Sequence, residues 1–227
     1  MSRDKSLRKI SRLWFNRSFK YEYSYHFNWL DRPIIQYPQD IVALQEIIWK
    51  VKPDLIIETG IARGGSLVFS ASILDLIGKG EVLGIDVNIH EKNRKELERH
   101  TMYKRITMIQ GSSVDKNVVK KVYKFAKRKK RVMVFLDSNH THEHVLNELK
   151  AYSPLVTKGS YMVVFDTVID DMPKKFFHKR PWGKGNNPKS AVIEFLKDSD
   201  RFIIDKKFEN KLLITVAPCG HLKCIKE

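Results

Sequence analysis

Cysteine is scarce in this chain, with two among 227 residues. Two thiols cannot build a disulfide framework, so the composition favours a reducing compartment and we expect a cytoplasmic protein. Long apolar runs are also missing, since no stretch approaches the roughly 18 residues that a membrane helix needs. The basic N-terminus has no apolar core of the kind found in secretory signals, so we expect none. Hydrophobic residues still make up 42% of the chain, which suffices for a single folded domain.

Acidic residues are the other shortage. Lys and Arg number 42 against 26 Asp and Glu, a net charge of +16, which favours an anionic partner. The excess is concentrated in residues 1–20, with seven basic residues and one acid, and in Lys120–Arg131, with eight and none. Each segment is either a solvated face or a docking surface for anionic lipid or a phosphosugar. Docking on lipid would place the protein at the inner membrane face. Nucleic acid is disfavoured, because the second segment lacks interleaved aromatics and no nucleic-acid-binding motif is present.

Short apolar runs alternate with helical patterns from Pro53 onward. We expect strands at residues 55–57, 82–85, 106–109, 132–136 and 161–164. We expect helices between them at residues 66–77, 91–99, 114–129 and 141–152. Strands that alternate with helices in this way predict a parallel sheet covered by helices on both faces.

The two ends of the chain complete this picture. A helix over residues 40–51 is expected, with Asp40 as its N-cap. Near the C-terminus, a helix over residues 188–197 precedes apolar runs at 202–204 and 211–216, which we expect to pair as a hairpin. The elements together predict an α/β protein with a Rossmann-like methyltransferase fold: a seven-stranded, mostly parallel sheet with one antiparallel strand. We expect a basic, aromatic-rich N-terminal arm over residues 1–30 and the Rossmann-like domain over residues 31–227.

Polar residues follow the first expected strand at its carboxyl end, where open parallel sheets bind ligands. The sequence ETGIARGGS runs from Glu58 to Ser66, and its glycines permit a tight turn and a close approach to a ligand. It matches neither the dinucleotide fingerprint nor a phosphate-binding loop. An acid before a glycine turn suits the ammonium group of an amino-acid moiety, as in S-adenosylmethionine. A plain strand–turn–helix connection would have the same pattern.

The next two strands end in further candidates. Asp86 ends the second strand, where an acid commonly binds the ribose hydroxyls of an adenosine ligand. Ser113 follows the third strand and could line an adenine pocket. Both residues could instead cap the helices that follow them.

Two acids follow the fourth and fifth strands, at Asp137 and Asp166. Carboxylates at adjacent strand ends can face one cation, and oxygen ligands suit Mg²⁺. His140 lies three residues beyond Asp137, close enough to act as a general base on a substrate hydroxyl. The segment Asp170–Pro188 is long and rich in Pro, Gly and Asn, which is typical of a lid or a mobile loop.

In combination, several sequence strings resemble the cephalosporin hydroxylase family from Asn28 to the C-terminus. They include IIQYPQDIVALQ, LIIETGIARGGSL, VFLDSNHTHEHV, VVFDT and RPWGKGNNPKSAV. The broader group consists of S-adenosylmethionine-dependent and Mg²⁺-dependent O-methyltransferases of sugar hydroxyls, including macrolide-sugar and rhamnosyl enzymes. Similar chains are associated with bacterial lipopolysaccharide and surface glycans.

The resemblance implies roles for individual residues. It implies cofactor contacts at Glu58, Gly60, Gly64, Ser66, Asp86 and Ser113. It also implies metal contacts at Asp137 and Asp166, with His140 as the catalytic base and Asp137 as its catalytic partner.

One position departs from the family pattern. The family has Glu then Asp after the fifth strand, whereas here Phe165 precedes Asp166. Catechol-type methyltransferases have Asp-Asn at this point, which would align with Asp166-Thr167 and makes Thr167 a third metal candidate. A hydroxyl is a weaker ligand than a carboxylate or an amide, so the metal dependence stays open.

The leading hypothesis is therefore an S-adenosylmethionine-dependent O-methyltransferase. Its acceptor would be a sugar or glycan hydroxyl, in the synthesis of surface polysaccharide, lipopolysaccharide or a secondary metabolite. Two alternatives remain: a cephalosporin-type hydroxylase, and a non-catalytic methyltransferase-like module that binds through its basic faces. The aromatic arm could also exchange between subunits of a homo-oligomer.

Overall fold

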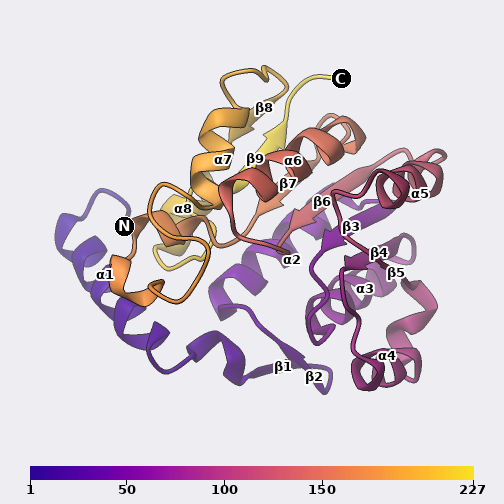
Figure 1. Ribbon diagram of the computed structural model, residues 1–227, viewed down its shortest axis with the longest axis horizontal. Coiled ribbons are helices and arrows are strands. Elements are labelled where there is room, and N and C mark those ends of the chain that lie inside the picture. The colour runs from indigo at the N-terminus through magenta and orange to yellow at the C-terminus, as the bar shows by residue number, and fades with distance from the viewer.

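A seven-stranded sheet forms the centre of the computed structural model, which describes residues 1–227 (Figure 1). Its strand order is β5-β4-β3-β6-β7-β9-β8. Only β9 is antiparallel to its neighbours, β7 and β8. This confirms the predicted fold class. The strands are β3 (Leu55–Thr59), β4 (Glu81–Asp86), β5 (Ile106–Gln110), β6 (Val132–Leu136), β7 (Tyr161–Val164), β8 (Phe202–Ile204) and β9 (His221–Cys224).

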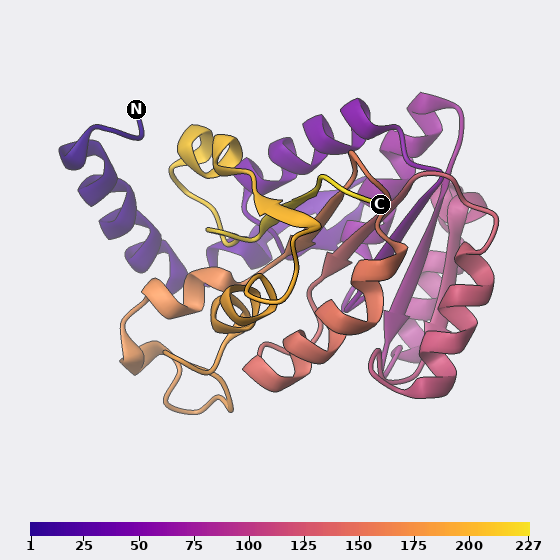
Figure 2. The same cartoon turned by 90° about the horizontal axis from the view of Figure 1, so that it is seen from above.

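Helices cover both faces of the sheet (Figure 2). One face packs against α2 (Pro38–Val51) and α3 (Gly65–Ile77). The other packs against α5 (Lys116–Ala126), α6 (His142–Tyr152) and α7 (Pro188–Phe195). Successive residues of a strand point to opposite faces, so the central strands have to be apolar throughout, as in Leu55, Ile56 and Ile57 of β3. Two further helices, α4 (Glu91–Glu98) and α8 (Lys206–Leu212), pack against the same core as α2 and α3 through Leu97 and Phe208.

The expected strand at residues 211–216 is wrong. Residues 206–212 form α8, and the strand that pairs with β8 is β9, at His221–Cys224. The connection between β8 and β9 therefore contains a helix and is not a tight hairpin turn. The apolar run was misleading because Val216 and Ala217 are buried as loop residues in the core, and a short apolar run does not by itself distinguish a strand from other buried segments.

Asp40 is also not the N-cap that the sequence suggested. Helix α2 begins at Pro38, after Tyr37. Asp40 lies inside the first turn and is buried, where its carboxylate accepts hydrogen bonds from the Thr215 hydroxyl and from the backbone N–H of Val216, at 2.9 Å for the latter. It ties α2 to the buried loop before β9, and burial raises its pKa to about 7.

We expect Asp40 to make the stability of the protein depend on pH. A carboxyl group whose pKa is raised on folding binds more protons in the native than in the unfolded state, so stability falls as pH rises between the two pKa values. From the shift between 3.8 and about 7, the loss is on the order of 4 kcal/mol. Asp40→Asn should remove it, so the variant gains stability relative to wild type between about pH 4 and pH 7 in urea unfolding.

The matched control is Asp198→Asn, at an exposed position. It should leave the pH profile of stability parallel to that of wild type. A parallel profile for Asp40→Asn would contradict the raised pKa.

The N-terminal arm is packed against the sheet domain. It contains α1 (Lys5–Phe19) and β1 (Phe27–Trp29), and β1 pairs antiparallel with β2 (Arg32–Ile34), just beyond the arm. The Phe15 ring stacks on Tyr37 with centroids 4.8 Å apart. The expected domain boundary, between residues 30 and 31, falls in the turn of the β1–β2 pair. None of the helices combines the length and the apolar character needed to cross a membrane.

Candidate active site

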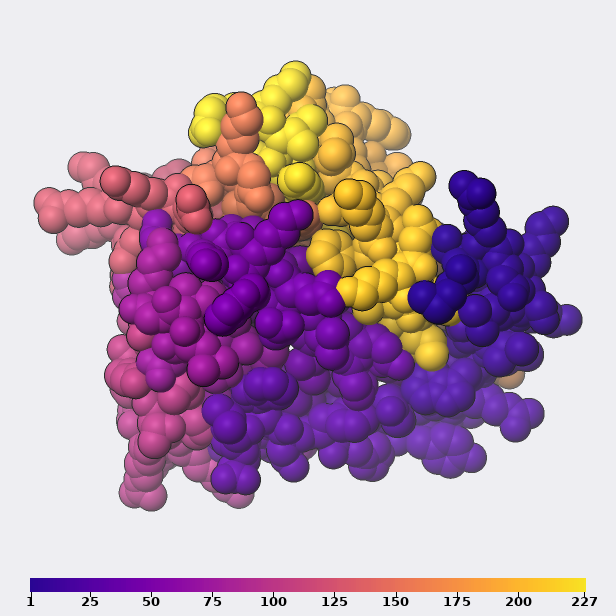
Figure 3. Space-filling model, turned by 180° about the vertical axis from the view of Figure 1, so that it is seen from behind, coloured from indigo at the N-terminus to yellow at the C-terminus, as the bar shows by residue number.

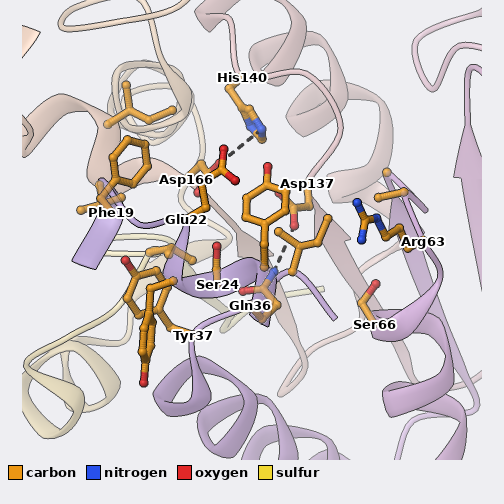
Figure 4. Close-up of a pocket in the computed structure, with 18 of the residues that line it drawn as sticks. Phe19, Glu22, Ser24, Gln36, Tyr37, Arg63, Ser66, Asp137, His140 and Asp166 are labelled. Carbon is orange, nitrogen blue, oxygen red and sulfur yellow. Dashed lines mark hydrogen bonds and ion pairs between the residues drawn. The ribbon is translucent and has the colours of Figure 1, made fainter. Parts of the chain in front are cut away.

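A cavity of about 580 Å³ lies at the carboxyl ends of β3, β6 and β7 (Figure 4). Its floor comes from the loop at residues 60–66 and from the residues that follow β6 and β7. Two segments from distant parts of the sequence wall it in. The N-terminal arm contributes Phe15 and Phe19, and the segment after β7 contributes Phe177 and Trp182. The parallel sheet therefore brings the predicted residues that follow β3, β6 and β7 to one cavity.

Glu58 is a buried acid that is not itself part of the cavity wall but lies behind Ser66. It is 2% exposed, and its Oε1 accepts a hydrogen bond from the Ser66 hydroxyl, which lines the cavity. Its Oε2 is buried without any hydrogen-bond partner. Burial raises the pKa of Glu58 to about 7. A buried carboxylate oxygen without a donor is strongly unfavourable, so the site fits the ammonium group of an amino-acid moiety.

The predicted glycines are required by close backbone packing. Gly60 has a φ of +92°, and a Cβ placed on it would lie 2.1 Å from the carbonyl oxygen of Asp137. Gly64 has a φ of +82°, and its Cβ would overlap the Leu97 side chain. Glycine therefore allows the loop after β3 to lie directly against the end of β6, which brings Glu58 close to Asp137.

Asp86 and Ser113 do not line the cavity. The Asp86 carboxylate accepts hydrogen bonds from the backbone N–H groups of Ile61 and Ala62, at 2.8 and 3.2 Å, and so holds the glycine loop. The Ser113 hydroxyl lies 3.1 Å from Nε2 of His144. Cofactor contacts at these two residues remain predictions.

Asp137, His140 and Asp166 form one cluster whose ligand atoms lie within 4.8 Å of one another. Nε2 of His140 is 3.2 Å from Oδ2 of Asp166, as Figure 4 shows. Gln36 donates to Oδ2 of Asp137 at 3.1 Å. Burial and the neighbouring Asp166 carboxylate raise the pKa of Asp137 well above its ordinary value. A divalent cation would relieve this repulsion, so the donor set fits Mg²⁺.

Phe165 stands where the family pattern has a glutamate, and its side chain points away from the cavity. Phe165 is buried in the core, edge-to-face on Phe135 with centroids 6.3 Å apart. Asp166 follows in a left-handed conformation, with a φ of 55°, and lines the cavity. Thr167 is fully buried, and its hydroxyl donates to the carbonyl of Pro218 at 2.6 Å. The structure thus brings His140, and not Thr167, to the two carboxylates.

Sequence reasoning assigned no role to Gln36. It lies within the QYPQD string and before any expected strand, so the rule of searching strand ends could not find it.

The segment at residues 170–188, expected to be a lid or a mobile loop, supplies one wall. Trp182 lies edge-to-face on His140, with centroids 4.9 Å apart, and the Arg180 guanidinium lies 5.4 Å from the centre of the Trp182 ring. Asp170 fastens the segment by accepting from the Gly185 N–H and from the Asn187 side chain, at 2.9 and 2.8 Å. His178 is exposed and is not among the residues of the cavity wall.

The sheet order, the glycine loop and the acidic strand ends define a Rossmann-like methyltransferase domain. A family model described as "Rhamnosyl O-methyltransferase/CmcI" matches residues 21–225, and the chain therefore belongs to this family. This confirms the resemblance seen in the sequence. A rhamnosyl O-methyltransferase of Mycobacterium tuberculosis (strain H37Rv) is 32% identical over 189 residues, which cover 81% of this chain and 72% of the relative. The Mycobacterium leprae relative is 29% identical over 147 residues, covering 64% of this chain and 62% of the relative.

Solved structures share the fold. The apo structure of CmcI-N160 has a TM-score of 0.62 at 18% identity, covering 89% of this chain and 78% of that one. CmcI-D160, described with Mg and S-adenosylmethionine, has a TM-score of 0.59 at 18% identity and the same coverage. CalS11, described as a TDP-rhamnose 3'-O-methyltransferase of calicheamicin biosynthesis, has a TM-score of 0.56 at 16% identity, covering 83% of this chain and 78% of that one.

Proposed function

We propose that this chain transfers a methyl group from S-adenosylmethionine to a hydroxyl of a sugar, as a small molecule or within a glycan. The observation that carries the proposal is the unpaired Oε2 of Glu58, held behind the lining residue Ser66, next to the cavity that also holds the cluster of Asp137, His140 and Asp166. One end of the cavity suits the amino-acid moiety of the cofactor, and the other suits a hydroxyl that has to lose a proton. The names of the family and of the mycobacterial relatives support a sugar acceptor.

The residues of the chain have separate tasks in this reaction. S-adenosylmethionine supplies an electrophilic methyl group on a sulfonium. Glu58 binds the ammonium group of the cofactor, and Ser66 holds the Glu58 carboxylate in place. His140 accepts the proton of the acceptor hydroxyl as the oxygen attacks the methyl carbon and the bond from carbon to sulfur breaks. Asp166, 3.2 Å from Nε2, stabilises the imidazolium that forms.

The cavity also contributes by positioning. Trp182 restricts the ring of His140 through its edge-to-face contact. The walls formed by the arm and by the segment after β7 exclude water and align the acceptor with the methyl group, which supplies much of the acceleration in bimolecular transfers. Mg²⁺, held by Asp137 and Asp166, would lower the pKa of the acceptor hydroxyl.

The hydroxylase alternative fits the site less well. Non-haem iron oxygenases use two histidines and one carboxylate, whereas the cluster here has one histidine and two carboxylates. A requirement for iron and 2-oxoglutarate, with no effect of S-adenosylmethionine, would support the hydroxylase.

Calorimetric titration with S-adenosylmethionine and S-adenosylhomocysteine, each with and without Mg²⁺, tests the proposal. We expect binding of both cofactor forms, followed by Mg²⁺-stimulated methylation of a rhamnosyl acceptor. Failure of both cofactor forms to bind would overturn the enzyme proposal and favour a non-catalytic module.

Asp166→Asn tests the metal part of the proposal. It keeps the shape of the side chain but removes one of the two negative charges that face the cation. We expect the Mg²⁺ concentration needed for half-maximal activity to rise about tenfold or more, with cofactor affinity in the absence of Mg²⁺ near that of wild type. Asp171→Asn, on an exposed acid paired with Lys189, is the control and should leave the Mg²⁺ response unchanged. An unaltered Mg²⁺ response in Asp166→Asn would remove this residue from the metal site.

A further inference from the structure

The outer face of α1 carries two largely exposed apolar side chains, Ile10 and Leu13, beside Trp14, which Tyr23 and Tyr37 partly cover. Ile10, Leu13 and Trp14 are 59%, 56% and 38% exposed. Their spacing of i, i+3 and i+4 places them on one stripe of the helix. The opposite face is buried through Ser11 and Phe15. Helix α1 is therefore apolar on two sides, only one of which packs against the domain.

Positive charge is abundant in this segment, and Arg17 lies on the stripe itself, four residues after Leu13 and seven after Ile10. Residues 1–20 hold seven Lys or Arg and a single acid, Asp4, whose side chain caps the helix by accepting from the Leu7 N–H. None of these basic residues takes part in an ion pair in the structure. Exposed aliphatic side chains on a helix that carries unpaired cations are a feature of helices that lie in the interface of an anionic membrane.

The second basic segment lacks the apolar half of this pattern. On α5, Tyr123 is 38% exposed, and its hydroxyl is engaged by the carbonyl of Ala151 at 2.9 Å. The aliphatic residues Val118 and Val122 face the core. Helices α1 and α5 also lie at opposite ends of the molecule in Figure 1, and Figure 3 shows α1 projecting from its edge. The structure thus separates two segments that looked equivalent in the sequence: α5 is a solvated basic face, while α1 has a surface that needs a partner.

We propose that the outer face of α1, formed by Ile10, Leu13 and Arg17 with the exposed part of Trp14, docks on an anionic lipid surface. Charge complementarity selects this occupant. A second copy of the chain that met the same face in a two-fold contact would bring two sets of like charges together, which opposes association. Nucleic acid would satisfy the cations but would leave the aliphatic stripe in water.

Docking would also orient the molecule. The buried side of α1 lines the site cavity through Phe15 and Phe19. A protein that lies on its α1 face therefore has the cavity next to the lipid surface. The proposal does not depend on the chemistry in the cavity, because lipid binding is measured without acceptor or cofactor.

Co-sedimentation of the full chain with vesicles tests the proposal. The probes are vesicles of phosphatidylcholine mixed with phosphatidylglycerol, and vesicles of phosphatidylcholine alone. We expect binding to the anionic vesicles only, with affinity that falls steeply as salt is raised. Leu13→Glu should weaken binding roughly tenfold or more, because it removes apolar burial and adds a charge that the lipid repels.

Two matched controls locate the surface. Leu76→Glu changes a leucine that is 75% exposed on α3 and should leave vesicle binding unchanged. Converting Lys9 and Arg17 to glutamine should reduce binding much more than converting Lys120 and Lys124 on α5. Far-UV circular dichroism checks that each variant is folded.

Three results would overturn the proposal. The first is that the protein binds neutral and anionic vesicles equally well, or binds neither. The second is that the α1 and α5 charge variants lose the same amount of vesicle binding. The third is a wild-type dimer in analytical ultracentrifugation that Leu13→Glu converts to a monomer, since the stripe would then be a subunit interface.

Discussion

His140→Gln is expected to lower the rate of methyl transfer by about 10²–10⁴-fold, which is the usual contribution of a general base. His140 is the only side chain in the cluster that can accept a proton without losing a negative charge needed for a cation. Glutamine can occupy the same space beside Asp166 but cannot act as a base. Single-turnover assays with saturating cofactor measure the effect on the chemical step.

Cofactor and metal affinities distinguish the two roles that the geometry allows His140. If it is the base, both affinities stay near wild type while turnover falls. If Mg²⁺ affinity falls together with turnover, His140 is a metal ligand and the assignment of the base is wrong. His142→Gln is the control, because His142 contacts Ser190 and Glu194, which do not line the cavity, and it should keep nearly full turnover.

Glu58→Gln is expected to weaken S-adenosylmethionine binding by about 10²-fold or more. Truncating or neutralising one partner of a buried charge pair typically costs 2–5 kcal/mol. Glutamine retains an oxygen to accept from the Ser66 hydroxyl, so the loop after β3 should keep its conformation. Calorimetry measures the affinity, and Glu143→Gln, at an exposed position on α6, should have no effect.

The pH dependence of binding gives a second test of Glu58. Burial raises its pKa to about 7 in the free protein, so part of the population is protonated at neutral pH. Only the ionised carboxylate pairs with an ammonium group, and cofactor affinity should therefore rise as pH increases from about 6 to 8. Glu58→Gln should remove this slope. A slope that persists in the variant would assign the titration to another group.

Much of the fold could be predicted because it depends on local pattern. The five parallel strands were expected within two residues of their observed ends, since central strands have to be apolar on both faces and β-branched residues are frequent in them. The wrong strand prediction at residues 211–216 has the same physical basis. Thr215 and Val216 are β-branched, as strand residues often are. They nevertheless lie in a buried loop, which is held by hydrogen bonds to the Asp40 carboxylate. Residues 221–224, with His and Lys among them, have little strand character, and only pairing with β7 and β8 makes them a strand.

The sequence alone determined the α/β architecture, the family and the edge of the sheet where Asp137, His140 and Asp166 gather, because parallel strands all present their carboxyl ends to one side. Only the tertiary structure decided which candidates meet. In the folded chain the side chains of Phe165 and Thr167 are buried in the core. Asp86 and Ser113 are not part of the cavity wall, and one oxygen of Glu58 has no hydrogen-bond partner. The tertiary structure also distinguished the two basic helices, because α1 has exposed aliphatic side chains whereas those of α5 pack against the core. The physical reason is that side-chain direction and burial depend on contacts between segments far apart in the chain, which composition and periodicity do not encode.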